Sequence, residues 1–270
     1  AEKGPDLKIG HDHALVKKLE ELIVEQQFSP GAALAYIKNG TEEYSTEISE
    51  KTLYNYIYRG DVFLVLNEKH LYEKGRRHYA EKSKKQAARA PRGTSIEKRP
   101  KEIGSREKFG HWEMDSVMGC KGSKQALLVL TERRTRMGII TLVEDHTAAS
   151  VVKAINRLER KFGKLFYTLF KSITVDNGSE FQDFEGIEIA HRRKGKRTIV
   201  FFCHPYSAYE RGSNENMNRL IRRWFPKGTN FDEVTKEQVA AAEEWVNRYP
   251  RKLLGWKSAA DLFDEELQAA

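Results

Sequence analysis

Three acidic side chains stand beside apolar segments that lie far apart in the sequence: Asp115 in HWEMD, Asp176 in SITVDNGSEF and Glu215 in SNENMNRL. Mg²⁺ prefers carboxylate oxygens and keeps coordination positions open for substrate phosphate. Three carboxylates can hold a two-metal site for in-line displacement at phosphorus. Four arginines and three asparagines accompany two glutamates within residues 210–224. Acids set among phosphate-binding side chains predict phosphoryl transfer on a nucleic acid.

The two glutamates of this stretch differ in their relation to a helix that we expect to begin near Ser213. The apolar side chains of that helix would form one stripe: Met217, Leu220, Ile221 and Trp224. Phosphate-binding side chains would share another face with Glu215: Asn218, Arg219 and Arg222. Glu215 lies in the first turn, where the helix dipole favours an ionised carboxylate. Glu210 precedes the helix, and its geometry stays open.

Ordinary structural roles compete with these interpretations. Asp176 opens an Asp-Asn-Gly turn, which is common, and a single acid such as Asp115 is often a strand-edge residue. His204 at a strand end is more often structural than a DNA contact. Lys227 in FPKG is either a phosphate contact or a solvated turn residue, and we count it with Arg211 among the candidates for DNA binding.

Composition limits the class of protein. The chain has 270 residues, a net charge of +8 and a pI of about 9.3, which suits a polyanionic partner. No apolar run approaches the roughly 20 residues that span a bilayer, and the first residues lack a signal-peptide pattern. Cys120 and Cys203 show no metal-binding spacing, so we expect reduced thiols in a cytoplasmic protein without membrane contact.

The first part of the chain shows helical patterns. HALVKKLEELIVEQQ has apolar residues at helical spacing. Ser29 and Pro30 begin a second helix, and Ser49 begins a third that ends at Gly60. Short capped helices match a helix-turn-helix whose third helix would present four side chains to DNA: Lys51, Thr52, Asn55 and Tyr56. A small helical bundle without a DNA role is the alternative.

Two further regions follow. Residues 70–105 are basic, poor in large apolar residues and broken by Pro and Gly, which predicts an extended linker; Arg76 and Arg77 in it are candidates for DNA contact. From about residue 108 the pattern reads β-β-β-α-β-α-β-α, a mixed sheet flanked by helices. We therefore expect a helix-turn-helix domain over 1–66, a basic linker over 67–105 and an α/β catalytic domain over 106–270.

The segments GHWEMDSV, TVDNGSEF and HPYSAYERGSNENMNRLIRRWFPKGTNF closely resemble the IS30 family of bacterial insertion-sequence transposases. RGTSIEKRP and VNRYPRKLLGWKSAADLF extend the resemblance over nearly the whole chain. It implies a DDE catalytic domain of the RNase H-like fold, with Asp115, Asp176 and Glu215 as catalytic metal ligands. The cofactor implied is Mg²⁺, two per site, with Mn²⁺ as a substitute.

The resemblance also implies double-stranded DNA partners, namely terminal inverted repeats and target DNA. It implies a homodimer or higher oligomer on DNA and a nucleoid-associated location. The function expected is metal-dependent cleavage at element ends and strand transfer. A catalytically inactive DNA-binding regulator, or another integrase or nuclease of this fold, is the alternative.

Two departures from the family pattern remain. Between Asp176 and Glu210 there are 33 residues, the family's usual spacing, and between Asp176 and Glu215 there are 38. We choose Glu215 because its flanking motif and helical face agree, and because HRRKGKRTI resembles a local insertion. Family members also usually carry a further N-terminal helix-turn-helix, and its absence here indicates a truncated chain.

Overall fold

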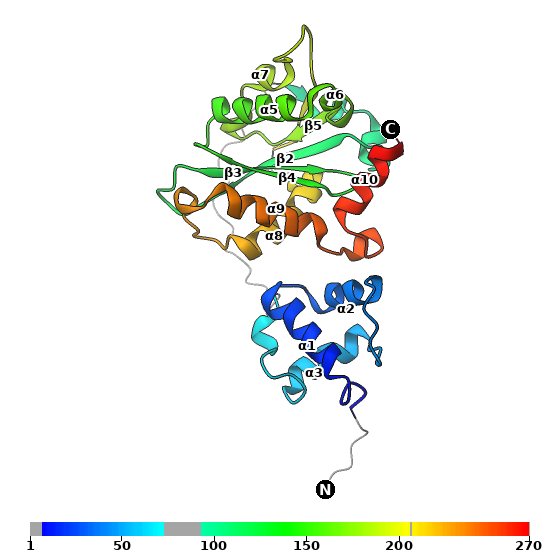
Figure 1. Ribbon diagram of the computed structural model, residues 1–270. Coiled ribbons are helices and arrows are strands. Elements are labelled where there is room, and N and C mark those ends of the chain that lie inside the picture. Colours follow the sequence, from blue (N-terminus) through cyan, green and yellow to red (C-terminus); the bar gives the residue numbers. More distant parts are fainter. Residues whose placement is uncertain (1–6, 73–92, 206, 270) are drawn as a thin grey trace. The chain divides into compact units, whose positions relative to one another are not determined.

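A computed structural model describes residues 7–72, 93–205 and 207–269. The chain forms two compact units (Figure 1). The first consists of residues 1–83 together with Tyr249–Ser258, and the second of Lys84–Arg248 together with Ala259–Ala270. Residues 106–270 were expected to form one domain, whereas Tyr249–Ser258 groups with the first unit. The expected boundaries at 66 and 105 stay predictions.

The first unit is all helical, as predicted. Its main helices are α1 (His13–Glu20), which continues as the π-helical η1 (Glu21–Glu25), α2 (Pro30–Asn39) and α3 (Glu50–Arg59). The predicted caps are confirmed: Ser29 accepts the N–H of Ala32, and Ser49 accepts that of Thr52. Gly60 ends α3 at φ 71°, a left-handed conformation that glycine adopts without strain. The helices close over buried side chains: Leu15, Leu19, Leu22, Leu53 and Ile57.

Segment 249–258 packs on α2 through specific contacts. The hydroxyl of Tyr249 accepts the N–H of Ser29 at 3.2 Å and donates to Ser29 Oγ at 2.9 Å. The rings of Tyr249 and Phe28 meet edge to face at 5.1 Å. The Asn39 side chain donates to the carbonyl of Trp256 at 3.4 Å. A segment distant in sequence thus completes the first unit.

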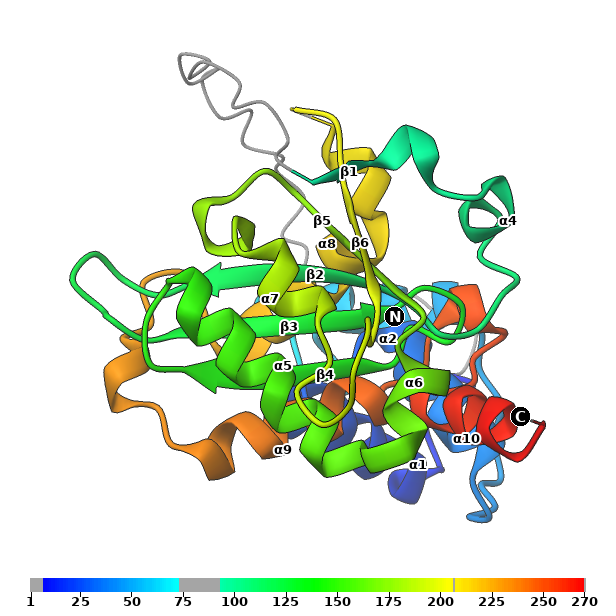
Figure 2. The same ribbon diagram turned by 90° about the horizontal axis from the view of Figure 1, so that it is seen from above.

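The second unit is built on one six-stranded sheet of order β1-β6-β5-β2-β3-β4. The strands are β1 (Thr94–Ser95), β2 (His111–Met118), β3 (Ala126–Glu132), β4 (Gly138–Val143), β5 (Ser172–Val175) and β6 (Ile199–Phe202). β2, β3 and β4 pair antiparallel and lie side by side in Figure 2, whereas β1, β6, β5 and β2 pair parallel.

Helices cover both faces of this sheet. In Figure 1, α5 (Ala148–Phe162), α6 (Phe166–Leu169) and α7 (Phe184–Glu188) lie on one face, and α8 (Gly212–Trp224) and α9 (Lys236–Arg248) on the other. Because strand side chains alternate between faces, β3 supplies Leu128 and Leu130 to the α5 core and Leu127 and Val129 to the α8 core. β3 is therefore buried on both sides.

Short helices and the C-terminal helix complete the described fold. They are η2 (Glu68–His70), η3 (Ile96–Lys98), α4 (Lys101–Gly104), η4 (Gly163–Leu165), η5 (Ser179–Phe181), η6 (Ala208–Arg211), η7 (Phe231–Glu233), η8 (Lys252–Leu254) and α10 (Ala259–Ala269). The predicted α/β class and its strand and helix order are confirmed. Within the described residues, none of the helices has both the length and the apolar composition needed to cross a bilayer.

Candidate active site

Asp115 lies in β2, and Asp176 directly follows β5, the neighbouring parallel strand. The register pairs Glu113 of β2 with Thr174 of β5, and Asp115 and Asp176 each come two residues further along the chain. Residues two apart in a strand share a face, so the two carboxylates emerge on the same side of the sheet. Asp115 lies within β2 rather than at its end, whereas Asp176 directly follows the last residue of β5, and the assignment of both as metal ligands stays a prediction.

Arg211 joins the two aspartates directly. Its Nη1 lies 3.0 Å from Asp115 Oδ1, and its Nη2 lies 2.8 Å from Asp176 Oδ2. Nη1 also donates to the carbonyl of Met114 at 3.2 Å. Burial lowers the pKa of Arg211, but the charges of Asp115 and Asp176 outweigh it and raise the pKa overall. Two carboxylates therefore converge on one cation.

The helix α8 runs beside β2 and adds a second contact to the acid pair. Asn218 donates through Nδ2 to Asp115 Oδ2 at 2.8 Å, and Arg222 donates to the carbonyl of Met118 at 2.8 Å. At 100° per residue, positions 215, 218 and 222 fall within an arc of about 60°. Glu215 therefore shares the helical face that contacts β2.

Glu215 itself is exposed, in the first turn of α8. Over the residues that the structure describes, no group of three or more His, Cys, Asp or Glu side chains has a geometry that could hold a metal ion. The structure thus brings Asp115 and Asp176 together with Arg211 and Asn218, and does not bring Glu215 into such a group. The assignment of Glu215 as third ligand stays a prediction.

Glu210 has a different environment. It lies in η6, before α8, and accepts the backbone N–H of His204 at 2.9 Å while its other oxygen lies 2.8 Å from His204 Nδ1. Burial raises the pKa of Glu210, but the hydrogen bonds from His204 outweigh burial and lower it overall. His204 also contacts Glu97 at 3.2 Å. Glu210 is thus tied to a histidine at the end of β6.

Glu113, which was not among the candidate site residues, is fully buried on β2. Its Oε1 forms a 2.9 Å ion pair with buried Arg133, and its Oε2 accepts the N–H groups of Ser213 and Asn214 at 2.9 and 3.0 Å. A carboxylate on the strand thereby caps the first turn of α8. The only signal in the sequence was an acid between the apolar residues Trp112 and Met114.

The apolar stripe predicted for α8 is buried in part, and some of the candidate DNA-binding side chains are exposed. Met217 and Ile221 are buried and Leu220 packs beside them, but Trp224 is 39% exposed. Exposed positions include four of the basic and polar candidates: Lys51, Asn55, Arg219 and Lys227. Thr52 is half-buried. Arg76 and Arg77 lie outside the described residues.

Tyr56 was predicted to lie on the exposed face of α3, and this prediction is wrong. Its side chain is only 6% exposed, and its hydroxyl accepts the N–H of Lys8 at 3.1 Å. Tyr56 precedes Ile57 and lies three residues after Leu53, so it falls on the apolar side of a helix with 3.6 residues per turn. We therefore remove Tyr56 from the surface presented to DNA.

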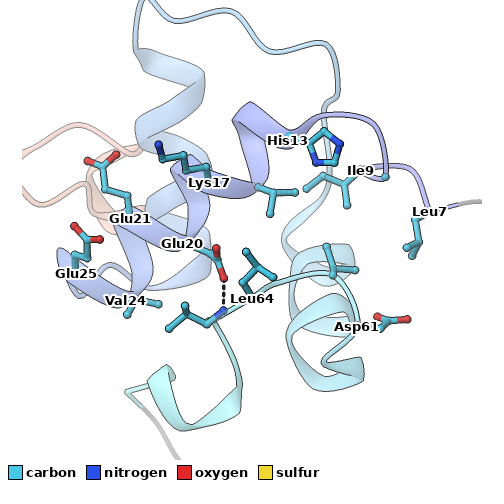
Figure 3. A pocket seen from close by; sticks show the side chains of 14 residues that line it. Leu7, Ile9, His13, Lys17, Glu20, Glu21, Val24, Glu25, Asp61 and Leu64 are labelled. Atoms are coloured by element: carbon cyan, nitrogen blue, oxygen red, sulfur yellow. Dashed lines mark hydrogen bonds between the residues drawn. The ribbon is translucent and has the colours of Figure 1, made fainter.

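A pocket of about 900 Å³ lies within the first unit, between α1 and the segment after α3 (Figure 3). Apolar side chains such as Val24 and Leu64 line it beside acids. Glu20 is already engaged, because it accepts the N–H groups of Val65 and Leu66 at 2.6 and 3.0 Å. None of the candidate catalytic acids lines this pocket.

The second unit thus combines a mixed sheet, two aspartates that share one arginine and an arginine-rich helix beside them. No family model matches the chain. The transposase for insertion sequence element IS1086 of Cupriavidus metallidurans is 31% identical over 248 residues, covering 90% of this chain and 70% of the relative. The chain therefore belongs to the IS30-type family of insertion-sequence transposases.

Two further relatives carry similar names. The probable transposase for the insertion-like sequence element IS1161 of Streptococcus salivarius is 36% identical, covering 80% of this chain and 58% of the relative. Transposase InsI for insertion sequence element IS30A of Escherichia coli K12 is 32% identical, and the match covers 92% of this chain and 64% of the relative. The chain thus spans about three fifths of these relatives. Among solved structures, the catalytic core domain of BIV integrase matches 60% of this chain and 98% of its own length at 17% identity, with a TM-score of 0.43.

Proposed function

We propose that this protein cleaves DNA at the ends of an insertion sequence and transfers the resulting strand to target DNA. The observation that carries the proposal is the convergence of Asp115 in β2 and Asp176, just after the adjacent parallel strand β5, on one cationic group. The family membership supports the same reaction. The partners we propose are terminal inverted repeats and target double-stranded DNA, bound by a dimer or higher oligomer on the bacterial nucleoid.

The donor set fits a divalent cation. Asp115 and Asp176 are hard oxygen ligands that already converge on a positive charge, and such oxygens suit Mg²⁺ or Mn²⁺. We propose Glu215 as the third ligand, because its helical face contacts β2 beside Asp115. When bound, two metal ions would activate the attacking hydroxyl or water and stabilise the leaving oxygen.

The chain's own residues orient the acids and hold the substrate. Asn218 fixes one oxygen of Asp115, so the carboxylate can turn less freely. Glu113 fixes the start of α8 and with it the position of Glu215. Exposed Arg219 and Lys227 supply charge for DNA phosphates. In the first unit, exposed Lys51 supplies charge from α3, and exposed Asn55 supplies a neutral hydrogen-bonding amide.

The test is cleavage and joining of a labelled terminal repeat by the full chain. Asp115→Asn and Asp176→Asn should each abolish both steps in Mg²⁺ while DNA binding, measured by gel shift, persists. A catalytically inactive regulator would bind the repeat but show no cleavage in the unaltered chain. A general nuclease would cut unrelated DNA equally well, and that outcome would overturn the strand-transfer assignment.

A further inference from the structure

Arg211 occupies the position between the two candidate metal ligands. Its side chain is 13% exposed, compared with 24% for Asp115 and 41% for Asp176, so it lies deeper than either acid. Each terminal nitrogen serves a different aspartate. A planar guanidinium suits this arrangement because its donors are held in a fixed fork.

Both oxygens of Asp115 are already engaged. Oδ1 lies against Arg211, and Oδ2 accepts from Asn218. A metal ion that binds Asp115 must therefore take a second lone pair beside one of these contacts or displace it. Asn218 is a neutral donor, whereas Arg211 is a cation. A metal ion bound to the same carboxylate would lie close to the Arg211 guanidinium, and two positive charges repel strongly in a partly buried site. A divalent ion would therefore displace Arg211 rather than Asn218.

Resting on the proposed function, we infer that Arg211 is a resident counter-cation that competes with divalent metal for Asp115 and Asp176. In the metal-free protein it offsets the repulsion between two neighbouring carboxylates. Metal binding releases it. Arg211 immediately precedes α8, so the released guanidinium stays beside the site and can bind a DNA phosphate, which couples metal loading to substrate capture. An arginine built permanently into the metal site would behave oppositely, since its removal would not tighten metal binding.

The test measures metal binding without DNA, using the full-length protein and Mn²⁺ or Mg²⁺ alone. Thermal unfolding is followed across a metal titration and checked by calorimetry. Arg211→Gln should unfold at a lower temperature than the unaltered protein in EDTA, because the aspartates lose their counter-charge. It should also need at least ~10-fold less metal for half-saturation, the change that 1.4 kcal/mol produces. Arg222→Gln is the matched control: it removes an arginine of the adjoining helix α8, whose guanidinium donates to the carbonyl of Met118.

The outcomes separate this inference from the proposed function. Asp115→Asn should remove the metal response in both backgrounds, which assigns the signal to the acid pair. If the unaltered protein binds metal through Asp115 but Arg211→Gln binds it no more tightly, the competition is refuted and the proposed function stands. If Arg222→Gln tightens binding equally, the effect is general charge and the inference is also refuted. If none of the proteins binds metal, the metal-dependent function fails and the inference fails with it.

Discussion

The carboxylate of Glu113 on β2 accepts the backbone N–H of Ser213, the second residue of α8, at 2.9 Å across 100 positions of sequence. The same side chain pairs with Arg133. One buried acid thus fixes the helix that carries Glu215 to the strand that carries Asp115. Glu113 is a positioning residue, since its oxygens are consumed by these partners.

Glu113→Gln should destabilise the second unit by about 3–5 kcal/mol, because it leaves the buried guanidinium of Arg133 without a counter-charge. Urea unfolding of the full chain measures the change. Glu107→Gln, at an exposed position, is the control and should lie within ±0.5 kcal/mol of the unaltered chain. Equal stability of the two variants would show that the pair contributes little.

Glu215→Gln should lower cleavage and joining by at least ~10³, since losing a metal ligand removes several kcal/mol of transition-state stabilisation. Glu210→Gln should stay within about tenfold, because an amide still accepts the backbone N–H of His204. Both are assayed at saturating Mg²⁺, where mass action cannot disguise a weakened site. A dead Glu210→Gln beside an active Glu215→Gln would favour the 33-residue spacing.

Stability should fall in acid because of His111. Burial, followed by the charges of Lys171 and Arg133, lowers the pKa of His111 to about 4. Between that value and the ordinary 6.5, the unfolded chain binds a proton that the folded chain does not, so stability present above pH 6.5 is lost as the pH falls. The loss is at most about 3 kcal/mol. His111→Gln should flatten urea-derived stability over this range, and exposed His191→Gln should not; parallel curves for both variants would contradict the assignment.

Tyr249→Phe should cost the first unit about 1 kcal/mol, because the phenol loses its hydrogen bonds with Ser29. Thermal unfolding of the full chain, read from the transition of the first unit, measures the change. Leu253→Ala alters the same segment at a side chain that is 70% exposed and should be neutral. A silent Tyr249→Phe would mean that water replaces the hydroxyl.

Lys51→Ala should weaken binding of all DNA sequences alike and reduce the slope of log affinity against log salt by about 1, as loss of one phosphate contact does. Fluorescence anisotropy at several salt concentrations gives the slope. Tyr56→Phe removes a hydroxyl that binds Lys8 inside the unit and should leave the slope unchanged. A reversed pattern would restore Tyr56 to the DNA-binding surface.

Local chemistry made part of the molecule predictable. Ser29, Ser49 and Gly60 mark helix ends through bonds to residues three or four positions away, so the sequence carries that information directly. Asp115 and Asp176 were candidates because the first lies in an apolar strand and the second directly follows one. Parallel neighbours then bring such positions together.

Contacts between distant segments were not predictable in this way. Glu113 pairs with a helix start 100 residues later, and neither segment shows a local pattern that names the other. Arg211 was expected at DNA but binds both aspartates, because the fold places it over them. From its position in the helix, Tyr56 could have faced either solvent or the core, and the structure shows that its side chain is buried.

Segment 249–258 has a consequence for how the chain can be divided. It follows α9 of the second unit in sequence, yet its Tyr249 binds Ser29, the N-cap of α2, and its Trp256 binds Asn39 at the end of α2. A single backbone cut between Tyr72 and Gly93 would therefore produce two fragments of which the larger still carries part of the smaller one's core. When the two fragments are expressed separately and mixed, they should associate and co-elute, so the chain is suited to split-protein complementation. A fragment ending at Tyr72 on its own would lack segment 249–258 of its unit.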